Sequence, residues 1–347
     1  MTFPSRNPAT GQVVGEATEC GEAELDGAIA AARQALDGSD WARDSALRAE
    51  SVQRLHDALV DHGDAMRALL TAEVGLPIGL VSSHYDEPVA RLLSTVPADS
   101  PGLVAVITPF TSPLAVALDA IGAVLLGGGT VVLKPAPDAS LAALELARIA
   151  AAVLPAGVLT VVTTRDVDVA IALTTDPRVD EVRFTGSAVN GERVRGAATG
   201  AGKRVVLDPG GVAPVRADTA AEVAAAAAVM CAHAGQGCRL PATVLVPKDR
   251  YDELVEVAAR TMADTGVGDP TDPATVCGPV VSPVQRARVL RYLALAETEG
   301  GRFVTGGHAV DRDGGWWIAP TVVAGLTTSS RLAREEILGP VLVVVPA

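Results

Sequence analysis

Residues 103–134 read LVAVITPFTSPLAVALDAIGAVLLGGGTVVLK. The apolar runs Leu103–Ile107 and Thr130–Lys134 predict two short strands, and the pattern over Leu114–Leu126 predicts a helix between them. Two strands joined by a helix over this length are typical of a parallel βαβ unit. The stretch therefore predicts an α/β fold.

The same alternation continues as far as Leu207. Further strands are predicted at Val158–Thr163, Glu181–Thr185 and Arg204–Leu207, and further helices at Ser140–Val153, Val167–Leu173 and Glu192–Ala198. This order is typical of a doubly wound parallel sheet with helices on both faces. The first hundred residues have helical periodicity instead, as at Leu25, Ile29 and Ala32, and predict helices.

Composition narrows the class of protein. The chain has 347 residues, which is long enough for two domains. A net charge of −13 argues against a nucleic-acid or anionic-membrane surface, because both need clustered basic residues. The chain has no apolar run long enough to span a bilayer and no N-terminal signal pattern, and its four cysteines are too few for a disulfide framework. These features predict a cytoplasmic protein.

Ligands of such sheets bind beyond the carboxyl ends of the strands. Gly127–Gly129 precede a strand, so we interpret them as a turn at the opposite edge, and no Gly-x-Gly-x-x-Gly follows the first strand. Gly186 and Ser187 follow the strand that ends at Thr185 and precede a helix, where they either hold a pyrophosphate or cap the helix. Lys134 ends its strand at the same edge, within reach of a ribose or a phosphate.

A thiol follows a glycine-rich turn in the second half of the chain. Cys238 comes directly after Gly235-Gln236-Gly237, and the alanine-rich run Thr219–Met230 before it predicts a helix. Backbone N–H groups beside the sulfur would stabilise a thiolate and an oxyanion, as covalent work on a carbonyl requires. The alternative is a buried, inert cysteine. Cys231 and His233 are two residues apart and would not share a helical face, so no metal site is predicted.

Further landmarks extend over almost the entire chain. They are Asn7-Pro8-Ala9-Thr10-Gly11, Thr108-Pro109-Phe110, Leu133-Lys134-Pro135, Leu154-Pro155-Ala156-Gly157-Val158, Phe184-Thr185-Gly186-Ser187, Asp208-Pro209-Gly210-Gly211, Gly235-Gln236-Gly237-Cys238, Val267-Gly268-Asp269-Pro270 and Glu335-Glu336-Ile337-Leu338-Gly339-Pro340. In this order they resemble the aldehyde dehydrogenase superfamily. The resemblance implies a Rossmann-like NAD(P)-binding domain with N-terminal helices at residues 1–208 and a second α/β domain, bearing the nucleophile, at 209–347.

The resemblance also implies a reaction and a set of site residues. The reaction is the oxidation of a small-molecule aldehyde to a carboxylic acid by NAD or NADP, through a cysteine thiohemiacetal and a thioester. Cys238 is the implied nucleophile. Lys134 would bind the adenosine ribose, and Glu336 the nicotinamide ribose. The implied cofactor-binding residues are Thr108, Pro109, Phe110, Lys134, Gly186, Ser187, Gly191, Glu336 and Leu338.

The sequence departs from the family pattern mainly at the implied catalytic and cofactor-binding positions. Asp208 precedes Pro209 where the family has its catalytic glutamate, and Thr111 is where it has the oxyanion asparagine. Pro137 replaces a glutamate that binds the adenosine ribose, which permits NADP, and Leu338 replaces a phenylalanine beside the nicotinamide. The aspartate is one methylene shorter, and a lost oxyanion donor typically costs about 2.7–4 kcal/mol of transition-state stabilisation. A divergent active site of reduced efficiency is therefore expected.

Two segments are shorter than the resemblance implies. Ile78–Gly102 is too short for the family's β-hairpin, and the sequence ends soon after Val341–Val345, where relatives continue. We therefore expect an incomplete second domain, and a monomer or weak dimer in place of a tight oligomer. The uncharged run Val341–Val345 is expected to be an exposed, adhesive edge.

Three functions remain open from the sequence. The retained cysteine, Lys134 and Glu336 favour an oxidoreductase, whereas the changes at Thr111 and Asp208 favour a non-catalytic relative that binds a nucleotide, a metabolite or a protein. The minor alternative is acyl transfer to a thiol such as coenzyme A, because a weakened water-activating base would suit a thiol acceptor.

Overall fold

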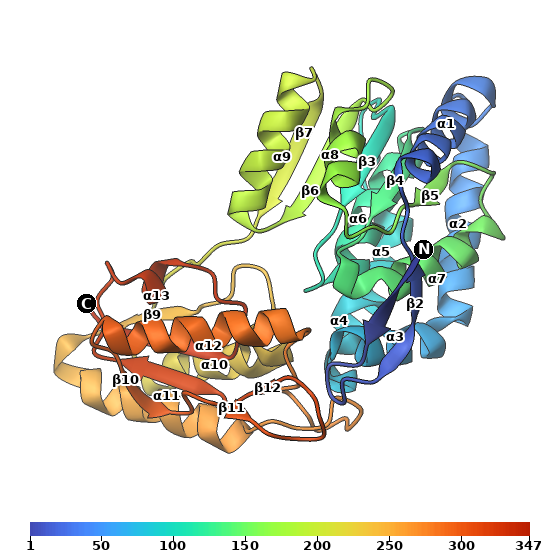
Figure 1. Cartoon of the computed structure of the whole chain (residues 1–347). Helices are drawn as coiled ribbons and strands as arrows, with labels where there is room; N and C mark the ends of the chain where they lie inside the picture. Colours follow the sequence, from blue (N-terminus) through green and yellow to red (C-terminus); the bar gives the residue numbers. More distant parts are fainter. The chain divides into compact units, whose positions relative to one another are not determined.

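A parallel sheet of five strands, in the order β5-β4-β3-β6-β7, is the centre of the first of two units in the computed structural model, which describes residues 1–347 (Figure 1). The first unit comprises Met1–Ser5, Val13–Leu70 and Val81–Pro209. The second comprises Arg6–Gln12, Thr71–Leu80 and Gly210–Ala347, so that two short segments from the N-terminal half of the chain belong to it. None of the helices combines the length and the apolar character that crossing a membrane requires.

Five helices follow the first two strands, and from β3 to β7 strands and helices alternate. Their bounds are β1 Thr2–Arg6, β2 Val13–Thr18, α1 Glu22–Gly38, α2 Ser45–Asp61, α3 Gly63–Val74, α4 Val81–His84, α5 Asp86–Arg91, β3 Leu103–Ile107, α6 Pro113–Leu126, β4 Thr130–Lys134, α7 Ser140–Ala151, β5 Leu159–Val161, α8 Val167–Thr175, β6 Glu181–Gly186, α9 Ala188–Gly200 and β7 Arg204–Pro209. The predicted parallel α/β sheet is confirmed. Strands β3 and β4 have the predicted bounds, and β5 is shorter than predicted.

The central strands β3 and β4 are apolar throughout because helices cover both faces of the sheet. On one face, α1, α8 and α9 pack their apolar sides against the strands, and this cluster includes Leu25, Ile29 and Ala32 of α1, Val169 and Leu173 of α8, and Ala198 of α9. Helices α2, α6 and α7 pack against one another. Helix α6 also contacts β3 and β4, and α7 contacts β5. The core of the first unit is therefore the sheet itself.

The N-terminal prediction was wrong over the first eighteen residues. Strands β1 and β2 form a two-stranded sheet of their own, and the expected helices begin only with α1. Phe3 and Ser5 are buried alternately along β1, which is the pattern of a strand that is covered on one face. The connection turns back at Asn7, whose N–H donates to the Gln12 carbonyl, and Gly11 adopts a positive φ of 69°. This segment is too short for its period of two to stand out from the sequence.

The second unit has its own five-stranded sheet, in the order β10-β13-β14-β9-β8. Only the β10–β13 pair is antiparallel. Helix α10 packs with α11, which also contacts β13 and β10, whereas α12 contacts α13 and β12. The bounds are β8 Val215–Arg216, α10 Ala220–Cys231, β9 Thr243–Val246, α11 Tyr251–Thr265, α12 Pro283–Thr298, β10 Arg302–Thr305, β11 Ala309–Val310, β12 Trp317–Ile318, β13 Thr321–Ala324, α13 Arg331–Arg334 and β14 Val341–Pro346.

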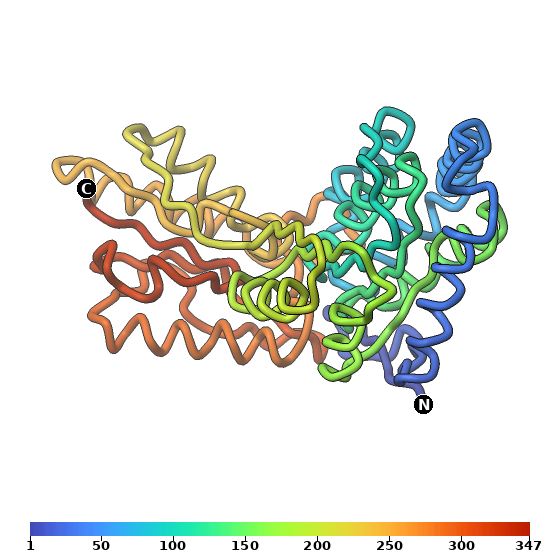
Figure 2. The backbone as a smooth tube through the Cα atoms, turned by 90° about the horizontal axis from the view of Figure 1, so that it is seen from above, coloured from blue at the N-terminus to red at the C-terminus, as the bar shows by residue number.

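The C-terminal strand β14 lies inside this sheet and not at its edge, so the expected adhesive edge is wrong. It pairs in parallel with β13 on one side and with β9 on the other. Val341–Val345 are at most 2% exposed. The red C-terminal end of the trace lies between β13, which comes just before it in the chain, and β9, which lies far earlier in the chain (Figure 2). An uncharged run of valines is what a strand buried on both faces requires.

Helix α10 leads from the sheet to the glycine-rich turn, and a capping box begins it. The Thr219 hydroxyl accepts from the Glu222 N–H, and the Glu222 carboxylate accepts from the N–H groups of Asp218 and Thr219. These bonds satisfy backbone donors that the first helical turn leaves open. The Thr219 hydroxyl also donates to Glu222 Oε2 at 3.0 Å, and this bond, with the two backbone bonds, holds the pKa of Glu222 below its usual range.

We expect Thr219→Ala to lower the free energy of unfolding of this unit by about 1 kcal/mol, because the cap accepts a backbone N–H that alanine leaves unsatisfied. For a unit of this size the melting temperature should fall by about 2–4 °C, measured by scanning calorimetry. Thr219→Ser, which keeps the hydroxyl, is the matched control and should melt within about 1 °C of the unchanged protein. Equal losses in both variants would show that the methyl packing and not the cap matters.

Candidate functional site

The carboxyl ends of four strands meet at one edge of the first sheet. Ile107, at the end of β3, pairs with Lys134 of β4 on one side and with Phe184 of β6 on the other, and Phe184 pairs with Leu207 of β7. The predicted residues at the ends of these strands, or just after them, therefore lie along this edge. They are Thr108, Pro109, Phe110, Thr111, Gly186, Ser187 and Asp208. Gly127–Gly129 form a turn before β4, at the opposite edge, as predicted.

Lys134 is a buried cation at this edge. Its side chain is sheltered from water, and its Nζ donates to the Pro135 carbonyl at 3.0 Å. Burial lowers the pKa of Lys134 to about 8, and the negative charge of Glu19 opposes that shift. An ammonium group in this setting gains from any further oxygen acceptor, such as a hydroxyl or a phosphate.

Glu19 belongs to this edge and was missed in the sequence. Its carboxylate accepts from the Thr164 hydroxyl at 3.0 Å, from the Arg165 N–H at 2.6 Å and from Arg165 Nε at 2.7 Å. The Arg165 guanidinium also lies over the Phe3 ring, 4.7 Å from its centroid. The N-terminal hairpin thus fixes the loop after β5, and no local pattern around Glu19 indicates such a distant partner.

Ser187 caps a helix, and Gly186 packs closely against an aromatic ring. The Ser187 hydroxyl accepts from the Asn190 N–H and caps α9, which is the interpretation that competed with a pyrophosphate seat. A side chain on Gly186 would overlap the Phe184 ring. Gly191 is buried in the first turn of the helix.

The two residues expected to do acid–base and oxyanion chemistry differ in environment. Thr111 is 3% exposed in the loop between β3 and α6. Asp208 is exposed on β7, opposite Thr185 of β6. The Asp208 carboxylate therefore keeps access to water, which is the molecule that the family's base activates.

A left-handed turn precedes Cys238 in the second unit. His233, Ala234 and Gly235 have φ values of 47°, 53° and 67°, and Arg239 has one of 55°. Left-handed backbone costs a non-glycine residue roughly 1–2 kcal/mol, so the surrounding bonds must hold this turn. Gly235 is required for a second reason, because a side chain there would overlap the Gly339 carbonyl oxygen.

The Gln236 side chain braces the turn. It is 1% exposed. Its amide Nε2 donates to the carbonyls of His233 (3.1 Å) and Pro279 (3.2 Å), and its Oε1 accepts from the Val281 N–H (2.8 Å). These bonds tie the turn to the segment before α12. The glycine-rich sequence indicated the turn, but the partners of Gln236 become visible only in the structure.

Cys238 differs from the other three cysteines in exposure. Its side chain is exposed, whereas Cys231 and Cys277 are buried and Cys20 is intermediate. Burial raises the pKa of Cys231 to about 11, against a hydrogen bond with Thr265 that lowers it, and raises the pKa of Cys277 further. The alternative of a buried, inert thiol therefore applies to Cys231 and Cys277 and not to Cys238.

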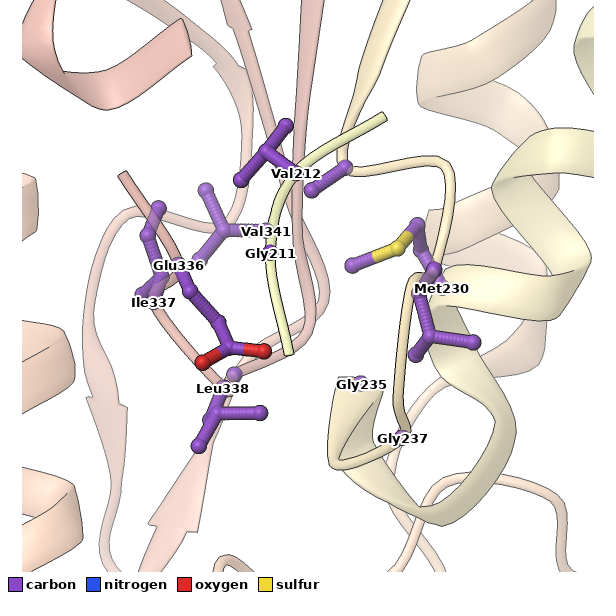
Figure 3. A pocket seen from close by; sticks show the side chains of 12 residues that line it. Gly211, Val212, Met230, Gly235, Gly237, Glu336, Ile337, Leu338 and Val341 are labelled. Carbon is purple, nitrogen blue, oxygen red and sulfur yellow. The ribbon is translucent and has the colours of Figure 1, made fainter. Parts of the chain in front are cut away.

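Glu336 is the charged residue of a small apolar recess in the second unit (Figure 3). The recess is lined by Gly211, Val212, Met230, Gly235, Gly237, Leu240, Ala242, Glu336, Ile337, Leu338, Gly339 and Val341. Burial raises the pKa of the Glu336 carboxyl, and the nearby Arg288 charge and a bond from the Gly211 N–H oppose the shift. Glu336 and the turn before Cys238 thus border one small space.

Comparison with known proteins identifies the family. The model of the aldehyde dehydrogenase family matches residues 1–97 and 90–347. The geranial dehydrogenase of Castellaniella defragrans is 33% identical over 98% of this chain and 77% of its own length. The 3,6-anhydro-alpha-L-galactose dehydrogenase of Streptomyces coelicolor is 32% identical over 99% of this chain and 76% of its own length.

Solved structures agree with this match. The NAD+ complex of an aldehyde dehydrogenase from Bacillus cereus matches with a TM-score of 0.90 and 29% identity. The match covers 100% of this chain and 76% of the Bacillus cereus chain. An indole-3-acetaldehyde dehydrogenase in complex with NAD+ has a TM-score of 0.93 and 30% identity, with the same coverage. Both relatives and structures are longer than this chain. Sequence, fold and the cysteine-bearing turn agree, and the chain belongs to the aldehyde dehydrogenase family, whose members oxidise aldehydes with NAD or NADP.

Proposed function

We propose that this protein oxidises an aldehyde to a carboxylic acid through a covalent intermediate on Cys238. The observation that carries the proposal is the exposure of Cys238 on a turn whose strained backbone is braced by the buried Gln236. Strain and buried bracing at a nucleophile are typical of a preorganised active site. A cysteine kept only for packing would be buried, as Cys231 and Cys277 are.

A buried lysine and a half-buried glutamate support the binding of NAD or NADP. The Lys134 ammonium fits the hydroxyls of the adenosine ribose or a phosphate oxygen. The Glu336 carboxylate fits the hydroxyls of the nicotinamide ribose, because it is held in an apolar recess and accepts hydrogen bonds. When bound, the nicotinamide supplies the hydride acceptor. Pro137 removes a carboxylate that would repel a 2′-phosphate, so both cofactors are proposed to bind.

Three side chains of the protein are proposed to carry the steps of the reaction. The Cys238 sulfur attacks the carbonyl carbon and forms a thiohemiacetal, and the Thr111 hydroxyl is the proposed side-chain donor to the oxyanion. After oxidation to the thioester, Asp208 is the proposed base that takes a proton from the attacking water. The carboxylate of Asp208 is one methylene short of the family's glutamate and is followed by the rigid Pro209, so hydrolysis is expected to be the slow half of the reaction.

We expect Cys238 to react with iodoacetamide well before the other cysteines at near-neutral pH. Exposure favours it, and burial keeps the thiols of Cys231 and Cys277 protonated. Peptide mass spectrometry of the folded protein over time measures the order of labelling, and denatured protein, in which all four label together, is the control. Labelling of all four at equal rates in the folded protein would favour a non-catalytic relative.

We expect mixing with an aldehyde and NAD+ or NADP+ to give a burst of reduced cofactor followed by slow turnover, because a thioester accumulates on Cys238. Asp208→Glu should speed the slow phase by about tenfold and leave the burst amplitude unchanged, since it restores the reach of the base. Asp208→Asn, which is isosteric but cannot accept the proton, is the matched control and should slow that phase.

Three outcomes separate the candidate functions. No burst with any aldehyde, together with no binding of either cofactor in calorimetry, would mean a non-catalytic relative. A slow phase that coenzyme A accelerates, with release of an acyl-thioester, would mean acyl transfer to a thiol. A slow phase unchanged in both Asp208 variants would mean that another group activates water.

A further inference from the structure

The loop that carries Glu336 has a conformation that its own sequence does not favour. Residues 336–338 lie in the connection between α13 and β14 and have no regular structure. Leu338 adopts a φ of 56°, in the left-handed region that a branched side chain rarely occupies. Some other part of the unit must therefore hold this loop.

Helix α12 supplies the bonds from one face. Gln285, Arg288 and Tyr292 are spaced three and four residues apart and so project from the same side of the helix. Gln285 Nε2 donates to the carbonyls of Ile337 (2.8 Å) and Leu338 (2.7 Å). The Arg288 guanidinium donates to the carbonyls of Glu336 and Ile337.

The same face also fixes the neighbouring carboxylate. The Tyr292 hydroxyl donates to Glu335 Oε2 at 2.7 Å, and Arg331 binds both oxygens of Glu335. These bonds lower the pKa of Glu335 to about 2, so that it stays ionised at any pH at which the protein would be assayed. Burial instead raises the pKa of Glu336, so that the two neighbouring carboxyls of this loop are shifted in opposite directions.

The result is a set direction for the Glu336 side chain. With its own carbonyl held by Arg288, its carboxyl reaches the backbone of Gly210 and Gly211, where it accepts from the Gly211 N–H. A side chain on Gly210 would overlap the Glu336 carboxylate, so the carboxyl is in close contact with this strand connection. The Arg288 guanidinium is the positive charge that acts on it.

We propose that Arg288 is a positioning residue for the nicotinamide end of the cofactor, because it holds the main chain of Glu336 and supplies the positive charge beside its carboxylate. The proposal rests on the proposed function, in which the Glu336 carboxylate accepts the ribose hydroxyls. In this proposal Arg288 acts through Glu336.

The test compares Arg288→Met, Arg288→Lys and the control Arg291→Met, which removes an exposed arginine from the same helix. We expect Arg288→Met to weaken NAD+ binding by about tenfold or more in calorimetry, because hydrogen bonds to a charged group are lost. Arg288→Lys keeps the charge but loses the planar fork of the guanidinium, so its affinity for NAD+ should lie between those of Arg288→Met and the unchanged protein. Arg291→Met should bind as the unchanged protein does, and the alkylation rate of Cys238 should stay the same in all three.

The pH dependence of NAD+ binding shows whether the Arg288 charge acts on the Glu336 carboxylate or whether Arg288 only stabilises the loop. Glu336 must be ionised to accept hydroxyl protons, so affinity falls as pH drops through its pKa. Removing the Arg288 charge raises that pKa further, so the midpoint should move to higher pH in Arg288→Met and return towards the original in Arg288→Lys. A structural role would lower affinity without moving the midpoint.

Unchanged affinity and midpoint in Arg288→Met would overturn this inference alone. Failure of the unchanged protein to bind either NAD+ or NADP+ would overturn both this inference and the proposed function, and it is seen before any variant is made. Should Arg288→Met fold poorly by circular dichroism, Arg288→Gln, which keeps a side-chain donor but removes the charge, replaces it and should move the midpoint to higher pH. Affinity equal to the unchanged protein in Arg288→Lys would then reject the role of the fork.

Discussion

The close approach of Gly235 to the carbonyl of Gly339 is the constraint on which the candidate site depends. Only a residue without a side chain fits at Gly235, and its left-handed backbone would be costly for any other residue. The contact brings the turn that leads to Cys238 against the loop that carries Glu336. The turn before Cys238 and the recess beside Glu336 are therefore parts of one packed arrangement in the second unit.

Backbone strain is concentrated in those two loops. The non-glycine residues with positive φ are Ser100, His233, Ala234, Arg239, Asp313 and Leu338, and four of these six flank Cys238 or Glu336. The strain persists because buried amides and an arginine bind the backbone from outside, through Gln236 on one loop and through α12 on the other. Such local cost is typical of a site shaped for chemistry and not for stability.

The parallel sheet of the first unit could be predicted from sequence because its strands are short, apolar and separated by clear helical patterns. The edge at which Lys134, Thr111, Ser187 and Asp208 gather followed from strand order alone. The β1–β2 hairpin could not be predicted in the same way, since its alternation extends over too few residues. The central place of β14 was also missed, because an uncharged apolar run has the same sequence at an edge as between two partners.

The sequence by itself determined the α/β class, the family resemblance and the candidate site residues that the resemblance implies, among them Thr111, Asp208 and Leu338. These depend on local patterns and on residue types at given positions. The tertiary structure decided which cysteine is exposed, how Gln236 braces the turn, and which helix holds Glu336. Burial, hydrogen-bond partners and left-handed backbone are set by segments that meet only in the folded chain, and no local pattern encodes them.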